Sequence, residues 1–220
     1  KVQIKAKNSK GVFYAFQTLR QLLPPNIEGG AQTGQKQWSI PCVQIEDYPS
    51  FPYRGLMLDV SRHFVNKDDV KRYIDLLAFH KMNVFHWHLT DDQGWRIEIK
   101  KYPKLTEIGG FRNKTIKGFM WDNPTEWDTN RYGGFYTQED VKEVLAYAKS
   151  RFVEVIPEIE MPGHCLAALA AYPEFSCSGG PFEVEGRWGV FNDIYCTKEE
   201  TFHFLKILLY QHLKYKQVQL

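Results

Sequence analysis

The chain of 220 residues is 43% hydrophobic and 15% aromatic, and its formal net charge is +2. It can therefore bury a sizeable core, which excludes a disordered chain, and mixed charges without a basic run disfavour nucleic-acid binding. The sequence contains no apolar run of about 18 residues and therefore predicts no membrane span. The sequence begins at Lys1 without a signal peptide, in what reads as the middle of a strand, so we expect the natural N-terminus to lie upstream.

The first 53 residues predict the end of one domain and a linker. Residues 2–6 (VQIKA) alternate in polarity like an exposed strand. A helix is expected over residues 12–23, with an apolar stripe that consists of Val12, Ala15, Phe16, Leu19, Leu22 and Leu23. Prolines at 41, 49 and 52 then punctuate a linker. We expect residues 1–46 to be the C-terminal part of a small α+β domain and residues 47–220 to belong to a second domain.

From residue 54 onward, predicted strands and helices alternate. Apolar strands are expected at residues 55–60, 83–89 and 152–160, and helices after Asn66, after Thr137 and over 198–213. Asn66 with Asp69 resembles a capping box. The alternation is typical of parallel βαβ units, and long loops after the strands suit a barrel with its chemistry at the strands' carboxyl ends. Since a complete (β/α)8 barrel has eight strands in about 250 residues, the predicted fold class is α/β, an incomplete TIM barrel of about the first three βα units.

Each predicted strand ends in polar side chains. These candidates are Asp59, Arg62 and His63 at the first strand, His86, His88, Asp91 and Asp92 at the second, and Glu158, Glu160 and His164 at the third. Asp59 interrupts an apolar strand, where a buried carboxylate needs a partner, so it reads either as a structural ion pair or as part of a site. Arg62 offers forked donors that suit vicinal hydroxyls or carboxylates.

The histidines allow two kinds of chemistry. His86 and His88 are two residues apart, so on a strand they face the same side and can form a metal pair that His164 completes, as in a metal-dependent barrel hydrolase. Alternatively, Asp91 holds His164, and His164 tunes a general acid elsewhere. The residue pattern alone leaves both interpretations open.

Cysteines and tryptophans add weaker signals. The four cysteines contain no CxxC pair, which disfavours a zinc ribbon. Cys177 and Cys196 flank a Gly-rich loop, so they are either bridged in an oxidising compartment or, with Cys42 and Cys165, free buried thiols. Trp87 and Trp95 read as packing residues, whereas ligand stacking is more plausible for the loop residues Trp121, Trp127 and Trp188.

Three motifs carry a resemblance to a known family. SRHF (61–64), HWHLTDDQGWR (86–96) and EMPGH (160–164), in that order, closely resemble the family-20 glycoside hydrolases, the β-N-acetylhexosaminidases, over about residues 2–205. The resemblance implies hydrolysis of terminal non-reducing N-acetylhexosamine (GlcNAc or GalNAc) from glycans by a substrate-assisted retaining mechanism. In that mechanism the sugar's own acetamide oxygen attacks the anomeric carbon, while a glutamic acid protonates the leaving oxygen.

The resemblance also implies roles for individual residues. Arg62 would bind sugar hydroxyls, and Asp91 with His164 would form the relay to the acid. Around them would lie Asp59, His88, Glu158 and Asp92. The resemblance implies neither a metal nor another cofactor. A bridge between Cys177 and Cys196 would favour an extracytoplasmic location.

One motif of the family is missing from the sequence. The family has an adjacent Asp-Glu pair in a Gly-Gly-Asp-Glu motif, but this sequence contains no Asp-Glu dipeptide, and residues other than aspartate follow its four Gly-Gly pairs. We therefore expect a fragment that is inactive and folds poorly by itself, and that aggregates, self-associates through an open barrel edge or needs a partner that supplies the missing half. A non-catalytic sugar-binding module is the alternative.

Overall fold

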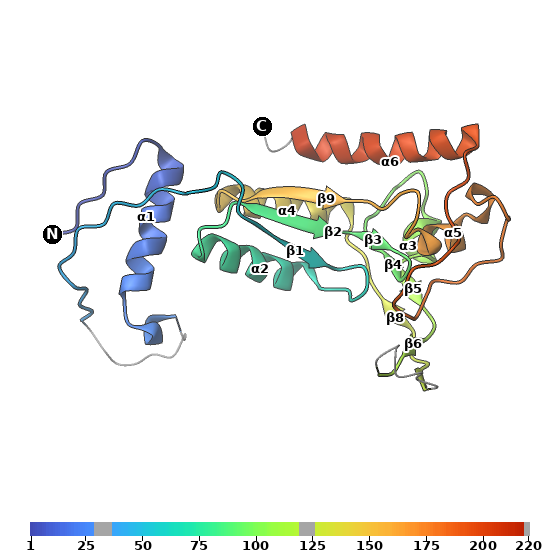
Figure 1. The fold of residues 1–220 in the computed structure, drawn as a ribbon, viewed down its shortest axis with the longest axis horizontal. Coiled ribbons are helices and arrows are strands. Elements are labelled where there is room, and N and C mark those ends of the chain that lie inside the picture. The colour runs from blue at the N-terminus through green and yellow to red at the C-terminus, as the bar shows by residue number, and fades with distance from the viewer. Residues whose placement is uncertain (29–36, 119–125, 218–220) are drawn as a thin grey trace.

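The centre of the fold is a parallel sheet of three strands. The computed structural model describes residues 1–28, 37–118 and 126–217 (Figure 1). Its strands are β1 (Gly55–Asp59), β2 (Val84–His88) and β9 (Glu154–Glu158), in the order β1-β2-β9. All pairings are parallel, which confirms the predicted α/β class.

Two helices cover one side of this sheet. They are α2 (Lys67–Phe79) and α4 (Gln138–Ser150). Thr137 and Asp140 form a reciprocal capping box at the start of α4. The Asn66 side chain caps α2, but Asp69 Oδ2 accepts from the Asn66 amide Nδ2 (2.7 Å). The box predicted for Asn66 and Asp69 is therefore only half formed, because a side-chain donor takes the place of the backbone donor.

Strand register divides the sheet into an apolar face and a polar face. On β2, Phe85 and Trp87 are buried in the core with the helices. The alternate residues point to the other side, where Asp59, His88 and Glu158 are register partners across the three strands. One sequence pattern thus supplies both the core and a row of titratable groups.

The excursion after β2 folds into short pairs of strands and one helical turn. Its elements are β3 (Thr90–Asp91), β4 (Gly94–Trp95), α3 (Lys104–Glu107), β5 (Phe111–Arg112), β6 (Thr115–Ile116), β7 (Trp127–Asp128) and β8 (Tyr132–Gly133). Trp87 and Trp95 are each 1% exposed, which confirms the packing interpretation. Trp121 lies outside the described residues.

A buried arginine ties these segments to the sheet. Arg96 is fully buried, and its guanidinium donates to the carbonyls of Val60, Ser61, Gln93, Gly110 and Gly134 at 2.6 to 3.4 Å. Burial, and then repulsion from Arg112, lowers the pKa of Arg96 to about 10. The carbonyls satisfy its N–H groups, so the Arg96 guanidinium joins the loop after β1 to the loop after β3.

The C-terminal part contains a disulfide-closed loop. After β9 come α5 (Leu166–Ala171), η3 (Pro173–Phe175) and α6 (Glu199–Gln217). The Cys177–Cys196 bridge spans 19 residues of sequence with Cα atoms 4.8 Å apart. Of the two alternatives for the cysteines, the bridge is therefore the correct one, while Cys42 and Cys165 are free.

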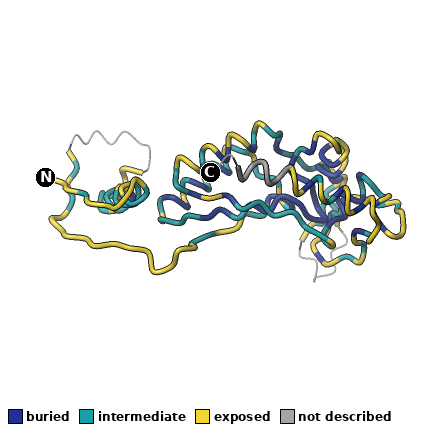
Figure 2. Tube along the Cα trace, turned by 90° about the horizontal axis from the view of Figure 1, so that it is seen from above, coloured by how far each residue is buried: buried dark blue, intermediate teal, exposed yellow. Residues whose placement is uncertain are grey.

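The N-terminal region contradicts two predictions. Residues 2–6 form no strand, because no described strand lies beside them to take up their backbone hydrogen bonds. Helix α1 (Ser9–Leu22) begins earlier than predicted because Asn8 caps it, and it is followed by η1 (Pro25–Ile27). Val12 and Phe16 of the predicted apolar stripe are 37% and 51% exposed, whereas Gln17 is buried, so the stripe is only partly covered. Figure 2 shows residues 41–53 as a mostly exposed run.

None of the helices in the described ranges is both long enough and apolar enough to cross a bilayer.

Candidate active site

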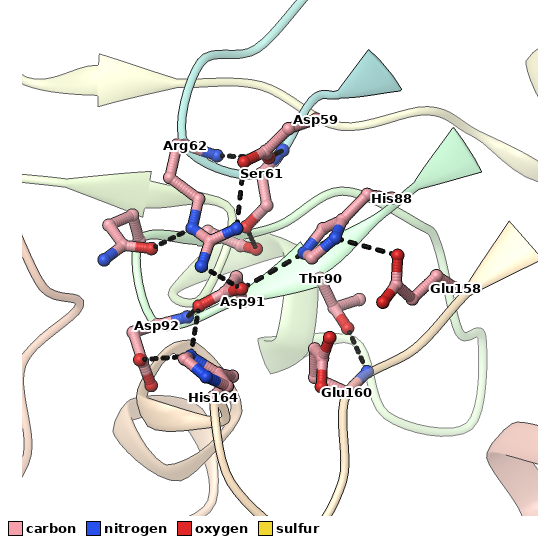
Figure 3. Close-up of polar contacts among 12 residues, drawn as sticks. Asp59, Ser61, Arg62, His88, Thr90, Asp91, Asp92, Glu158, Glu160 and His164 are labelled. Atoms are coloured by element: carbon pink, nitrogen blue, oxygen red, sulfur yellow. Dashed lines mark hydrogen bonds and ion pairs between the residues drawn. The ribbon is translucent and has the colours of Figure 1, made fainter. Parts of the chain in front are cut away.

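Arg62 is held by three partners in the loop after β1 (Figure 3). Its Nη1 donates to Asp59 Oδ2 (2.9 Å) and its Nε to Gln93 Oε1 (2.9 Å), while Nη2 lies 2.5 Å from Asp91 Oδ2. Asp59 Oδ1 also accepts the backbone N–H groups of Ser61 and Arg62, which fixes this turn. A guanidinium has five N–H donors, so these three contacts leave two for a ligand on a side chain that is 25% exposed.

Asp91 is the junction of the site. Its side chain is 1% exposed, and Oδ2 contacts both Arg62 and His88 Nε2 (3.1 Å). Its Oδ1 accepts the N–H of Asp92 (2.7 Å) and lies 3.1 Å from His164 Nδ1. Burial opposes ionisation, but the bonds from His88 and Asp92 and the charges of Arg62 and His164 lower the pKa of Asp91. It is therefore ionised at neutral pH.

His164 is positioned by a turn after β9. Its backbone is left-handed (φ 50°), an uncommon conformation for a residue other than glycine. Nδ1 lies 3.1 Å from Asp91 Oδ1 and 3.2 Å from Asp92 Oδ2, so the proton that joins the ring to these carboxylates is on Nδ1. That leaves Nε2 of a partly exposed ring for another partner.

Asp92 anchors the segment that follows His164. Its Oδ1 accepts the N–H of Leu166 at 3.0 Å, and its side chain is 1% exposed. Burial, reinforced by the charge of Asp91, raises the pKa of Asp92. The two adjacent aspartates therefore differ in their readiness to ionise.

His88 connects Asp91 to the third strand. Its Nδ1 lies 2.9 Å from Glu158 Oε2, and His86 Nε2 lies 2.6 Å from the same oxygen, although neither ring makes a well-directed hydrogen bond to it. Burial disfavours protonation of His88, yet the bond to Asp91 and the charges of Asp59 and Glu158 raise its pKa. These contacts favour the protonated form of His88, which lies between two carboxylates.

Glu160 lies beside Glu158 at the end of β9. Its backbone N–H donates to Thr90 Oγ1 at 3.0 Å. Burial and a hydrogen bond with Glu158 raise the pKa of Glu160.

The geometry does not bring together the three histidines of the metallohydrolase alternative. Among the described residues, the groups with ligand atoms within 4.8 Å of one another are His88–Glu158–Glu160 and Asp91–Asp92–His164. His88 and His164 fall into different groups, and His86 falls into neither. A single centre built on these histidines is therefore the wrong interpretation of their spacing.

Other candidates lie at the edge of the site or outside it. His63 is exposed, with its ring centroid 5.2 Å from that of Tyr132. Trp188 is 56% exposed on the disulfide-closed loop. Trp127 is half-buried, with Lys114 Nζ 5.2 Å from its ring centroid.

Sequence reasoning missed two buried residues that hydrogen-bond to Arg62. Gln93 and Arg112 are buried, and Arg112 donates to the carbonyl of Arg62 (2.9 Å) and to Thr115 Oγ1 (2.7 Å). Arg112 ends the short strand β5, which the sequence did not predict, and neither residue has a spacing typical of a catalytic group. A search for the remaining partners of Arg62 would find them, but those partners are far apart in the sequence.

The arrangement has the groups needed to bind a polyol. It offers a forked donor with free N–H groups, an ionised carboxylate and a histidine that the carboxylate orients. A carboxylate–histidine pair of this kind can support proton transfer to or from a bound group.

The chain matches known proteins along nearly its whole length. The catalytic domain of glycosyl hydrolase family 20 matches residues 51–218, and domain 2 of the same family matches residues 1–48. A beta-hexosaminidase of Porphyromonas gingivalis is 50% identical over 93% of this chain and 25% of its own length. One of Vibrio furnissii is 45% identical over 79% of this chain and 27% of its own length.

Solved structures agree with these matches. The N-acetyl-beta-hexosaminidase of Streptomyces plicatus, in complex with Thio-NAglucal, has a TM-score of 0.81 and 42% identity over 96% of this chain and 39% of its own chain. A mutant of the Streptomyces plicatus enzyme in complex with the product GlcNAc has a TM-score of 0.82, with the same identity and coverage. The chain thus spans about a quarter of the length of the two curated relatives. By these matches, the chain belongs to glycosyl hydrolase family 20.

Proposed function

We propose that these residues form the sugar-binding side of a β-N-acetylhexosaminidase active site. In this proposal residues 47–220 provide the first three βα units of a (β/α)8 barrel, and residues 1–46 are the end of the small α+β domain before it. The family matches and the parallel order β1-β2-β9 support this arrangement.

The observation that carries the proposal is the shared carboxylate of Asp91. Arg62, which would bind hydroxyls of a terminal N-acetylhexosamine, and His164, which would face the general acid, both contact this buried group. Binding of the sugar and orientation of the relay histidine thus depend on the same charge. Asp59 and His88 hold it from two further sides.

The proposed reaction is substrate-assisted hydrolysis with retention. The 2-acetamido oxygen attacks the anomeric carbon as a glutamic acid protonates the leaving oxygen, and His164 Nε2 would contact that acid. The 220 residues contain no Asp-Glu dipeptide, so the acid and the aspartate that orients the acetamide would come from residues outside these 220. By itself, the chain would bind the sugar without hydrolysing it.

The proposed setting is extracytoplasmic, with glycans that end in N-acetylhexosamine as substrates. The Cys177–Cys196 bridge supports it, because such bonds persist in oxidising compartments. Leu56 and Met57 on the edge strand β1 are 47% and 49% exposed, and we propose that this edge mediates self-association. Size-exclusion chromatography with light scattering tests the latter: a monomer at all concentrations contradicts it.

Titration of the 220-residue chain with N-acetylglucosamine, followed by NMR, tests the binding role. We expect saturable shifts near Asp91 and Arg62, weaker binding of glucose, and at least tenfold weaker binding of N-acetylglucosamine to Arg62→Ala, because a charged hydrogen bond contributes roughly 1.5–3 kcal/mol. The chain should release no chromophore from a chromogenic N-acetylglucosaminide. Turnover that disappears in Glu160→Gln would show that the acid is misplaced.

A chimera separates the enzyme from a non-catalytic binding module. Residues 1–220 would replace the matching part of the Porphyromonas gingivalis beta-hexosaminidase, to which they are 50% identical. Hydrolysis by a folded chimera supports the enzyme. A folded chimera that binds the sugar but lacks activity favours the binding module.

A further inference from the structure

Gln93 uses both ends of its side-chain amide. Oε1 accepts from Arg62 Nε (2.9 Å), and Nε2 donates to the backbone carbonyl of Arg187 (2.7 Å). The residue is 3% exposed. Because Arg62 is only a donor and the carbonyl only an acceptor, one orientation of the amide satisfies both contacts.

Arg187 belongs to the loop that the disulfide closes. Within the part of the chain that the structure describes, this loop is tied to both sides of the site. Glu185 N donates to the carbonyl of Asp92 (3.0 Å), and Tyr195 N donates to the carbonyl of Pro162 (2.9 Å), in the turn that carries His164. The Cys177–Cys196 bridge therefore restrains a segment with contacts near both Arg62 and His164.

The carbonyl of Gln93 is also held by residues outside that loop. Its carbonyl accepts from Arg96 Nη2 (3.4 Å) and from Arg112 Nη1 (3.3 Å), and both arginines are buried. With its main chain fixed, Gln93 has only side-chain torsions left to vary, and the Arg187 carbonyl selects among them.

We propose that Gln93 is a positioning residue through which the disulfide-closed loop 177–196 sets the orientation of the Arg62 guanidinium. This inference rests on the proposed sugar-binding role of Arg62. It assigns the loop a part in sugar affinity without direct contact between bridge and sugar. Asp59 and Asp91 hold the Nη ends of Arg62, so loss of the Gln93 contact tilts the guanidinium rather than releasing it.

Two variants separate the two ends of the amide. In Gln93→Glu, one oxygen of the ionised carboxylate still accepts from Arg62 Nε in a charge-assisted bond, while the other meets the Arg187 carbonyl and cannot donate to it, so the tie to the loop breaks. Gln93→Leu breaks both contacts. The loop is released independently in the double variant Cys177→Ser/Cys196→Ser.

The ligand-free readout is hydrogen exchange at Arg62 Nε–H, identified by NMR from its absence in Arg62→Lys. Without the bridge, exchange should be about 3- to 10-fold faster, the factor that corresponds to loss of one hydrogen bond. The same double variant should bind N-acetylglucosamine about 3- to 10-fold more weakly. In the Gln93→Glu background, removal of the bridge should change neither value further, because coupled sites are non-additive.

Gln17→Glu and Cys42→Ser are matched controls. Gln17 is also buried and also accepts from an arginine, Arg20 Nη1 (3.0 Å), but in α1; Cys42 is an exposed free thiol. Neither should alter exchange at Arg62 Nε–H. If the bridge variant does not fold, Gln93→Glu with the bridge intact must itself bind N-acetylglucosamine about 3- to 10-fold more weakly.

The inference is overturned if Gln93→Glu and removal of the bridge have additive effects on exchange or affinity. It is also overturned if exchange at Arg62 Nε–H is unchanged in Gln93→Glu, Gln93→Leu and Cys177→Ser/Cys196→Ser. If the wild-type chain binds no sugar, the proposed function fails, while the exchange measurements still decide the coupling.

Discussion

The two faces of the three-stranded sheet are built from the same strands and have opposite properties. On β2, Phe85 and Trp87 are almost fully buried in the core with α2 and α4, whereas the alternate residues His86 and His88 face carboxylates. One face buries apolar area, which stabilises the fold. The other keeps charges whose mutual contacts fix them in place. Stability and chemistry are thus separated by the two-residue period of a strand, and four changes test that separation.

Trp87→Ala, on the apolar face that α2 and α4 cover, should have the largest effect, which is on the free energy of unfolding. Trp87 packs against Phe85 (ring centroids 5.7 Å apart) and Tyr136 (4.7 Å). Loss of a buried tryptophan costs about 3–5 kcal/mol, a large part of a domain's stability. Urea denaturation should show this loss in the free energy of unfolding. A loss below about 1 kcal/mol would mean that this face is not the core.

Asp91→Asn should have the next largest effect, on catalysis rather than folding. In the hydrolytic chimera, turnover should fall by roughly 10² or more, the scale of a general-acid contribution. The asparagine keeps the shape but removes the charge shared by Arg62, His88 and His164. Steady-state kinetics measure it, and wild-type turnover in the variant would refute the assigned role.

His88 should make stability depend on pH in a window that begins at about 6.5, the unfolded pKa of histidine. Its pKa is raised in the folded protein, so its contribution is complete below the unfolded value of about 6.5 and is lost as pH rises through the folded pKa. The difference in melting temperature between wild type and His88→Gln should shrink from pH 6 to pH 9. The exposed His203 provides a control, since His203→Gln should show no such trend.

Met57→Ser should have the smallest effect. Met57 lies in the same row as His86 on the open face and is 49% exposed. Substitutions of this kind change stability by within about 0.5 kcal/mol. The same urea titration used for Trp87→Ala measures the change, and a loss above about 2 kcal/mol would show that the open face is covered in solution.

Much of the fold was predictable because its signals are local. The alternating pattern of β2, the helix starts at Asn66 and Thr137, and the polar strand ends depend on a few neighbouring residues. These signals indicated the parallel α/β class and brought Arg62, Asp91 and His164 to one edge. They failed for residues 2–6, where alternation was present but no described strand lies alongside to pair with it.

The family, the order of the elements and the residue types at the strand ends could be inferred from local sequence. Which of these residues share a proton or a charge depends on how distant segments pack. His86, His88 and His164 looked like one set in the sequence, but His86 and His88 lie against Glu158, whereas His164 lies against Asp91 and Asp92. Gln93 and Arg96 had no signal, because their partners lie 14 to 94 residues away in most of their contacts. Spacing along a strand or helix is a local property, whereas the pairing of charges depends on how distant segments pack.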